Sequence, residues 1–307
     1  MKSQVKQESI FLPVGRGQEE LHLRRIYRDP EGTPLFLLHG SIENGRIFYS
    51  ESGKGFGPYL AAEGFDVYVG DLRGRGLSRP PIRRGSKYGQ REAILEDIPA
   101  FLSEIQKRRG RRAPHWIAHS WGGVLLMAAY ARFPEWRQGL ESVLCFGSKR
   151  RISVFNREKF LKIDLFWNLA APILARIYGY LPMIEWKMGS DNETISSLRD
   201  DRAWVQAGSP WIDPADGFDY GGAILEAPPP PTFHFAAVQD RYLGHPSDVQ
   251  DFILETKPRR LKYQLLSRAN GQKRDYGHID MLTHPDAPLD HFPMALDWLS
   301  GGFTRPE

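Results

Sequence analysis

Short apolar segments alternate with helix-like segments along most of the chain, and this alternation restricts its fold more than any other feature. Residues 34–38 and 142–146 are apolar at nearly every position, which is typical of strands buried on both faces of a sheet. Residues 88–109 instead carry apolar side chains at helical spacing, with one polar face. Buried strands joined by such helices predict an α/β fold, with a mostly parallel central sheet and helices on both of its faces.

The same patterns place the other strands and helices. An antiparallel strand is predicted at residues 21–27, where polar and apolar side chains alternate. The remaining strands are predicted at residues 65–69, 115–118, 233–238 and 261–266, and the remaining helices at residues 57–63, 121–133, 246–255 and 291–299.

The alternation stops after Ser148 and resumes only beyond a proline run at residues 228–231. The chain between these points is rich in aromatic residues, irregular, and helical in patches. We therefore expect one α/β core made of residues 1–148 and 228–307, with residues 149–227 inserted after a strand as a mainly helical cap. An insertion at that point lies above the carboxyl edge of the sheet, where a lid would cover a binding site.

Composition and charge exclude several other classes of protein. The chain has 307 residues, one cysteine and a net charge of +4. The single cysteine, Cys145, allows neither an intrachain disulfide nor a cysteine-based zinc site. The small net charge argues against a nucleic-acid-binding protein, and the basic run at residues 107–112 is better explained as a solvated helix end.

Targeting features predict a cytoplasmic protein. Residues 1–9 are polar and lack the apolar region of a signal peptide. The longest nearly uncharged apolar run, residues 165–175, is well short of the roughly 20 residues that a membrane-spanning helix needs. We expect no transmembrane segment, and we leave open a transient contact of this part of the insertion with a membrane surface.

The strongest sequence motif is Ala118-His119-Ser120-Trp121-Gly122-Gly123, which follows a predicted strand and opens a predicted helix. It matches the G-x-S-x-G pattern of a nucleophile elbow, with alanine in place of the first glycine. Small residues on both sides of Ser120 let the chain turn sharply, and His119 and Gly122 are expected to support this turn. Serine is also a common N-cap residue, and the motif alone does not separate that structural role from a nucleophile.

A nucleophilic serine needs a histidine base and an acid that orients the histidine. Asp240 directly follows the strand predicted at residues 233–238, and His278 lies beyond the last predicted strand and before the closing helix. The order serine, acid, histidine along the chain favours these two residues. Alternatives for the acid are Asp248 and Asp280, and alternatives for the base are His245, His284 and His291, of which the last two are expected to be solvated.

A second glycine turn, His39-Gly40-Ser41, follows the first buried strand. Gly40 permits a tight turn that points the next backbone N–H into the site, so the amides of Ser41 and Trp121 would form an oxyanion hole. His39 is expected to make structural hydrogen bonds rather than to act as the base.

Together these segments resemble the α/β-hydrolase fold family. The likeness covers about residues 30–148 and 228–300, and the inserted segment of this chain matches the family only as a cap. The segment Gly277-His278-Ile279-Asp280 is similar to the end of lysosomal acid lipase-like and bacterial esterase members. The matching motifs are Leu38-His39-Gly40, residues 71–78, residues 118–123, Asp240 and Gly277-His278.

The resemblance implies ester-type hydrolysis by Ser120, His278 and Asp240, with the backbone N–H groups of Ser41 and Trp121 as the oxyanion hole. The chemistry is then that of a serine hydrolase of the esterase or lipase type, which forms an acyl-enzyme. Neither a metal nor a cofactor is expected.

The substrate is expected to be a small, apolar ester. Part of the aromatic wall in residues 149–227 must roof the serine, and an apolar roof selects an apolar acyl or alcohol group. Glu43 is an unusual acid so close to the oxyanion hole, and it either tunes substrate choice or faces solvent. A thioesterase, a C–C bond hydrolase or an acyltransferase with the same triad, and a non-catalytic hydrolase-fold binding protein, remain open.

Overall fold

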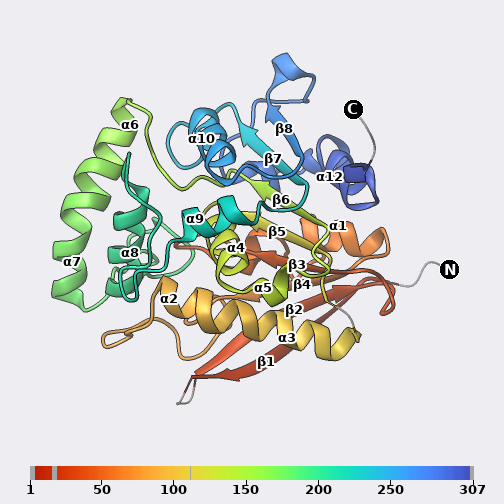
Figure 1. Ribbon diagram of the computed structural model, residues 1–307, viewed down its shortest axis with the longest axis horizontal. Coiled ribbons are helices and arrows are strands. Elements are labelled where there is room, and N and C mark those ends of the chain that lie inside the picture. The colour runs from red at the N-terminus through yellow and green to blue at the C-terminus, as the bar shows by residue number, and fades with distance from the viewer. Residues whose placement is uncertain (1–3, 16–18, 111, 305–307) are drawn as a thin grey trace.

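The computed structural model describes residues 4–15, 19–110 and 112–304. Within these ranges eight strands form a single sheet in the order β1-β2-β4-β3-β5-β6-β7-β8 (Figure 1). The strands are β1 Lys6–Val14, β2 Glu19–Tyr27, β3 Pro34–Leu38, β4 Asp66–Asp71, β5 His115–His119, β6 Ser142–Phe146, β7 Thr232–Ala237 and β8 Leu261–Leu266.

Most of this sheet is parallel. The strands from β4 through β3, β5, β6 and β7 to β8 run parallel, whereas β2 pairs antiparallel with both β1 and β4. The prediction of a mostly parallel α/β sheet with an early antiparallel strand is confirmed. Because the carboxyl ends of the parallel strands meet at one edge, the loops after β3, β5, β6 and β7 are brought together there.

Helices pack on the sheet from both sides. They are α1 Phe56–Ala62, α2 Gln90–Glu92, α3 Ile98–Arg109, α4 Trp121–Arg132, α5 Pro134–Arg137, α10 Pro246–Thr256, α11 Asp280–Thr283 and α12 Phe292–Leu299, with a π-helical turn Ala93–Asp97 before α3. Short 3₁₀ turns lie at Gly45–Ile47, Arg268–Asn270, Ala287–Leu289 and Gly302–Thr304.

Two cores result, because successive residues of a buried strand point to opposite faces of the sheet. Phe36 and Leu38 of β3 pack into one core with α3 and α4. Leu35 and Leu37 of the same strand pack into the second core with α1 and α12. Because these central strands have no polar side, both faces of the sheet must be covered, and helices cover them.

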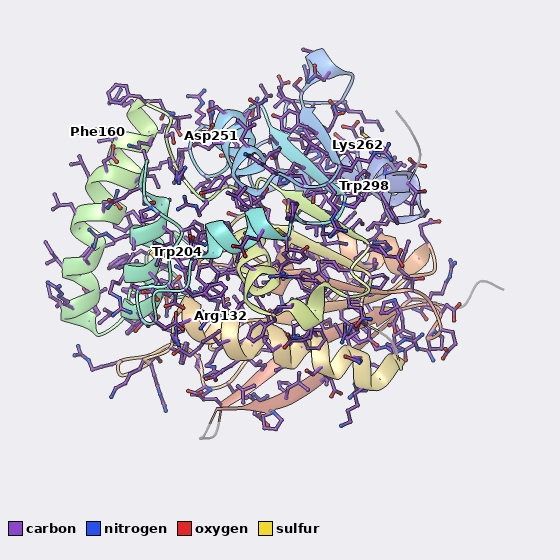
Figure 2. The ribbon with its side chains drawn as sticks, viewed as in Figure 1. Arg132, Phe160, Trp204, Asp251, Lys262 and Trp298 are labelled. Atoms are coloured by element: carbon purple, nitrogen blue, oxygen red, sulfur yellow. The ribbon has the colours of Figure 1, made fainter. Side chains whose placement is uncertain are left out.

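The connection between β6 and β7 is mainly helical, as predicted. Its first part is one continuous helical stretch made of α6 Arg157–Lys159, a π-helical section Phe160–Ala170 and α7 Ala171–Tyr178; α8 Ile195–Val205 and α9 Tyr220–Glu226 follow. We call residues 157–178 the outer helix, because Phe160 lies on the side of the molecule away from the sheet, whereas Trp204 of α8 packs towards the core (Figure 2). The boundaries 149 and 227 of a separate cap stay a prediction.

The later part of this connection is fastened to the core by ion pairs. Arg75, in the loop after β4, forms a buried two-fold hydrogen-bonded pair with Glu193, and both distances are 2.7 Å. Arg91 of α2 forms a further ion pair with Asp213 at 2.7 Å. The outer helix contacts the core through the buried side chain of Ile163 and through exposed ion pairs, such as Arg241–Glu158 at 3.0 Å. Among the described residues, no helix combines the length and the apolar character needed to cross a bilayer.

Candidate active site

Ser120 lies at a strained turn between β5 and α4. Its backbone has φ +53° and ψ −126°, a conformation that L residues other than glycine rarely adopt. The turn is tight, because a Cβ atom at Gly122 would lie only 2.5 Å from the carbonyl oxygen of His39. The serine amide donates a hydrogen bond to the carbonyl of Phe146 at 2.8 Å, which ties the turn to β6. This is the local geometry expected of a nucleophile elbow.

Asp240 and His278 are in direct contact, although 38 residues separate them in sequence. The imidazole Nδ1 donates a hydrogen bond to Asp240 Oδ2 at 2.5 Å. Burial alone would raise the pKa of Asp240, but the charge and the hydrogen bond of His278 outweigh it and lower that pKa. The carboxylate therefore stays ionised at neutral pH and holds the proton of His278 on Nδ1, which leaves Nε2 as the basic nitrogen.

The alternative acids have other partners. Asp248 accepts a hydrogen bond from the amide of Ser153 at 2.9 Å, and burial raises its pKa. Asp280 accepts one from the amide of Gly277 at 2.5 Å and so shapes the loop that carries His278. Asp240 is the acid that bonds the imidazole of His278.

The alternative histidines also lie outside the Asp240 contact. His245 bonds Ser247 at the start of α10. His284 bonds the amide of Asp286 at 3.1 Å. His291 was expected to be solvated, which is wrong: it is buried between aromatic rings, and its Nε2 donates to the carbonyl of Met281 at 2.6 Å.

The glycine turn after β3 lies against Ser120. A Cβ atom at Gly40 would lie 2.8 Å from the serine Cβ, so this position has room for glycine only. His39 is fully buried and bonds backbone groups: its Nδ1 donates to the Gly40 carbonyl at 2.8 Å, and its Nε2 accepts from the Leu72 amide at 3.1 Å. Burial lowers the pKa of His39, which agrees with a neutral ring that fixes the turn.

A cavity of about 810 Å³ lies over this edge of the sheet. Ser41, Ser120, Trp121 and His278 all line it. Trp121 is the first residue of α4, where a helix leaves its backbone N–H groups without intrahelical partners. The wall contributed by the β6–β7 connection has an apolar part made of Ile152, Ile163, Phe166, Trp167, Met183, Ile184, Met188 and Val205. The same connection also contributes Lys149, Lys162, Lys187, Gly189, Ser190 and Asp201.

Known proteins resemble parts of this chain. A family model described as the alpha/beta hydrolase fold matches residues 33–137, which include β3, the serine turn and α4. Together with the topology of the sheet, this match shows the α/β-hydrolase fold. Human (Homo sapiens) lysosomal acid lipase/cholesteryl ester hydrolase is 25% identical over 134 residues, which cover 41% of this chain and 34% of the lipase. The chain thus matches about a third of the length of this curated relative.

Solved structures resemble the fold of this chain over nearly its whole length. A bromoperoxidase of Bacillus anthracis has a TM-score of 0.62 at 13% identity, covering 95% of this chain and 100% of the bromoperoxidase. A carboxylesterase of Bacillus subtilis has a TM-score of 0.56 at 14% identity, covering 96% and 92% of the two chains. Similarity at these identities is similarity of fold, and the same fold carries different activities.

Glu43 is buried, which excludes the alternative that it faces solvent. Its Oε1 accepts hydrogen bonds from the Gly40 amide at 2.8 Å and from His119 Nδ1 at 2.7 Å. The second ring nitrogen of His119 donates to the carbonyl of His278 at 2.9 Å. Because oxygen acceptors bind both ring nitrogens, His119 carries a proton on each of them, and Glu43 and His119 form a buried ion pair.

This ion pair holds the loop of His278 in place. Burial alone would lower the pKa of His119, but the carboxylate of Glu43 raises it. Burial alone would raise the pKa of Glu43, but the charge of His119 lowers it. The rings of His119 and His278 are 4.6 Å apart, so a fixed cation lies beneath the histidine that Asp240 orients.

Glu43→Gln should lower the free energy of unfolding by about 3 kcal/mol near pH 6, because it leaves a buried cation without its anion. Folding raises the pKa of His119, so its contribution is complete below the unfolded value of about 6.5 and is lost as the pH rises through the folded value. Folding lowers the pKa of Glu43, so its contribution is complete above the unfolded value of about 4.5 and is lost as the pH falls through the folded value.

Urea unfolding of wild type and Glu43→Gln at several pH values measures this difference. It should be largest between about pH 4.5 and 6.5 and should shrink in alkaline solution. Glu158→Gln, which changes exposed ion pairs with Arg241 and Lys162, is the control and should change stability little at any pH. A difference for Glu43→Gln that does not vary with pH would show that the two residues do not form an ion pair.

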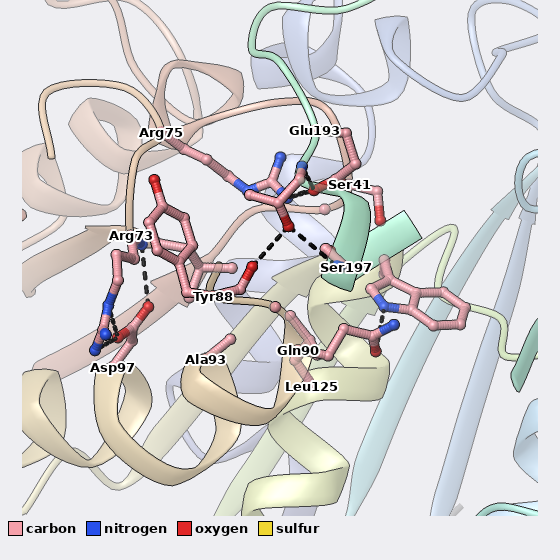
Figure 3. Close-up of a pocket in the computed structure, with 15 residues that line it drawn as sticks. Ser41, Arg73, Arg75, Tyr88, Gln90, Ala93, Asp97, Leu125, Glu193 and Ser197 are labelled. Atoms are coloured by element: carbon pink, nitrogen blue, oxygen red, sulfur yellow. Dashed lines mark hydrogen bonds and ion pairs between the residues drawn. The ribbon is translucent and has the colours of Figure 1, made fainter. Parts of the chain in front are cut away.

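A polar network joins the glycine turn to the β6–β7 connection, and Figure 3 shows the pocket lined by Ser41 and Gln90 of this network. The indole N–H of Trp121 donates to Gln90 Oε1 at 3.0 Å, and the Gln90 amide donates to Asp201 of α8. The hydroxyl of Ser41 donates to the other carboxyl oxygen of Asp201 at 3.2 Å. Burial, reinforced by the charge of Glu193, raises the pKa of Asp201 well above its ordinary value, which favours the neutral carboxyl.

Proposed function

We propose that this chain is a serine hydrolase that cleaves carboxylic esters through an acyl-enzyme. The observation that carries the proposal is the 2.5 Å hydrogen bond between His278 and Asp240, at a cavity that Ser120 also lines from its strained turn. A serine, a histidine and an ionised acid are the three parts that this chemistry needs. The partial likeness to a lipase supports an ester as the bond that is cleaved.

In the proposed mechanism the hydroxyl oxygen of Ser120 attacks the ester carbonyl carbon while its proton passes to Nε2 of His278. Asp240 stabilises the imidazolium that forms. The amides of Ser41 and Trp121 donate hydrogen bonds to the developing oxyanion, each worth a few kcal/mol of barrier. His278 then protonates the leaving alcohol, and water attacks the acyl-enzyme with His278 again as the base.

We also propose that residues 149–227 act as a cap that determines which substrates fit. The apolar side chains that this segment places around the cavity favour an apolar acyl or alcohol group, because they remove it from water. Each methylene group buried against them is worth about 0.8 kcal/mol.

A series of p-nitrophenyl esters from acetate to palmitate tests the function. We expect kcat/KM to rise about fourfold per methylene until the cavity is filled, and then to fall. A fluorophosphonate should label Ser120, as mass spectrometry of peptides would show. Labelling without turnover of any ester would redirect the assignment to a thioesterase, a C–C bond hydrolase or an acyltransferase. Absence of both labelling and turnover in the folded protein would indicate a binding protein.

A further inference from the structure

A buried lysine in the cavity has no anion of its own. Lys149 is the third residue after β6, its side chain lines the cavity, and only 5% of the residue is exposed. Its ammonium group lies 5.3 Å from the centre of the Trp121 ring. Among the described residues it has neither a hydrogen-bond acceptor nor an ion-pair partner. A buried, unpaired cation is costly, so an anion from outside the chain would be stabilised strongly beside it.

Each of the four carboxyl groups that act electrostatically on Lys149 has another bonding partner. Burial lowers the pKa of Lys149, and four acidic residues act against this through space: Asp240, Asp201, Asp248 and Glu43. Asp240 bonds His278, Glu43 bonds His119, and Asp248 accepts the amide of Ser153. Asp201 bonds Ser41 and Gln90, and its raised pKa favours the neutral form. None of the four therefore forms the short contact that would neutralise the ammonium group.

We propose that Lys149 binds a carboxylate of the substrate, and that the natural substrates are esters that carry a free carboxylate, such as half-esters of dicarboxylic acids. The inference rests on the proposed ester hydrolysis and adds the chemical class of the substrate. Trp121 contacts the ammonium group through its ring and provides one of the oxyanion amides, so the cation is on the same side of the cavity as the scissile carbonyl.

A half-ester fits each part of this cavity. Its ester carbonyl faces Ser120, its methylene groups contact the apolar wall, and its carboxylate reaches Lys149. The charge-assisted hydrogen bond that forms there is stronger than a neutral one, and it gains from the low polarity of the surroundings. Because Lys149 is buried and its ammonium group lies against the Trp121 ring, one spacing between the ester and the carboxylate should be preferred.

Monoethyl and diethyl esters of malonate, succinate, glutarate and adipate test the proposal, with released ethanol as the readout. The wild type should cleave the best half-ester at least about tenfold more efficiently than its diester. Lys149→Met should reduce that preference at least about 30-fold, mostly through KM, and should leave kcat/KM of the diester within about threefold. An equal loss on both esters, or a wild type that prefers the diester, would overturn the proposal.

A control variant removes a lysine charge outside the cavity. Lys159→Met changes an ion pair with Asp164 on the outer helix, and Lys159 does not line the cavity. It should leave the preference for the half-ester unchanged. If it lowers that preference as much as Lys149→Met does, the effect comes from net charge and the proposed contact is wrong.

Binding to Ser120→Ala separates this proposal from the proposed hydrolysis. Calorimetric titration with the monoethyl ester and the diethyl ester needs no turnover. Adding Lys149→Met should weaken binding of the monoethyl ester at least about 30-fold and should spare the diethyl ester. This result would support the carboxylate site even if the wild type cleaved no ester, whereas equal binding by both proteins would reject the site even if esters were cleaved.

Discussion

Ser120→Ala is expected to lower kcat/KM for the best p-nitrophenyl ester by at least about 10⁴-fold and to abolish labelling by the fluorophosphonate. The variant removes the attacking oxygen but leaves the cavity, the two amides and the Asp240–His278 hydrogen bond in place. Circular dichroism and the unchanged midpoint of thermal unfolding would show that the fold persists. Retention of more than about 1% of the activity would rule out Ser120 as the nucleophile.

Glycine at the same position provides a matched second variant. Ser120 has φ +53° and ψ −126°, and such a backbone costs a residue with a side chain about 1–3 kcal/mol. Ser120→Gly should therefore be as inactive as Ser120→Ala but more stable by about 1 kcal/mol in urea unfolding. Equal stability of the two variants would show that the turn is not strained.

Asp240→Asn should lower kcat by about 10³ to 10⁴-fold with little change in KM. The ionised carboxylate accepts the Nδ1 proton of His278 at 2.5 Å, which keeps Nε2 free to accept the serine proton. An asparagine amide can donate to Nδ1 instead, so the imidazole proton moves to Nε2 and the base is lost. Rates for the matched variants with a saturating ester would measure the effect.

Asp248→Asn is the control for this substitution, because Asp248 is also a buried acid beyond β7 but bonds a backbone amide. It should retain activity within about threefold, since surface and structural changes away from the reacting atoms act mainly on stability. If Asp248→Asn were the inactive variant and Asp240→Asn the active one, the acid of the triad would be misassigned.

Sequence patterns predicted those parts of the fold that bury both faces. The strands β3 and β6 were predicted with the bounds that they have, because each is a short apolar run that is buried at every position. β1 was not predicted, because an edge strand has little to bury: of Lys6–Val14 only Ile10 lies in the core. The polar composition of that segment gives no clear strand pattern, and the strand is stabilised by its pairing with β2.

The site was predictable where strand ends and chain order determine it, as for the contact of Asp240 with His278. The ion pair of Glu43 was not predictable, because its partner His119 lies at the end of another strand and sequence alone does not give the distance between the two residues. Lys149 was overlooked, although a signal existed. It follows β6 at the carboxyl edge of the sheet, the same edge from which Ser120 and Asp240 project, but the strand–helix alternation stops at Ser148 and Lys149 therefore falls in the predicted insertion.

The buried pair between Arg75 and Glu193 has a mechanical consequence for the proposed cap. Pulling two desolvated charges apart costs several kcal/mol, so a motion that opens the cavity should leave this pair intact. The cap should then turn about a fixed end near residues 191–193, while the outer helix moves through an arc and gives up its exposed ion pairs and the apolar contacts of Ile163. The largest molecule that can reach Ser120 is therefore limited by the width of that arc on the microsecond-to-millisecond timescale of hinge motions, and not by the volume of the closed cavity.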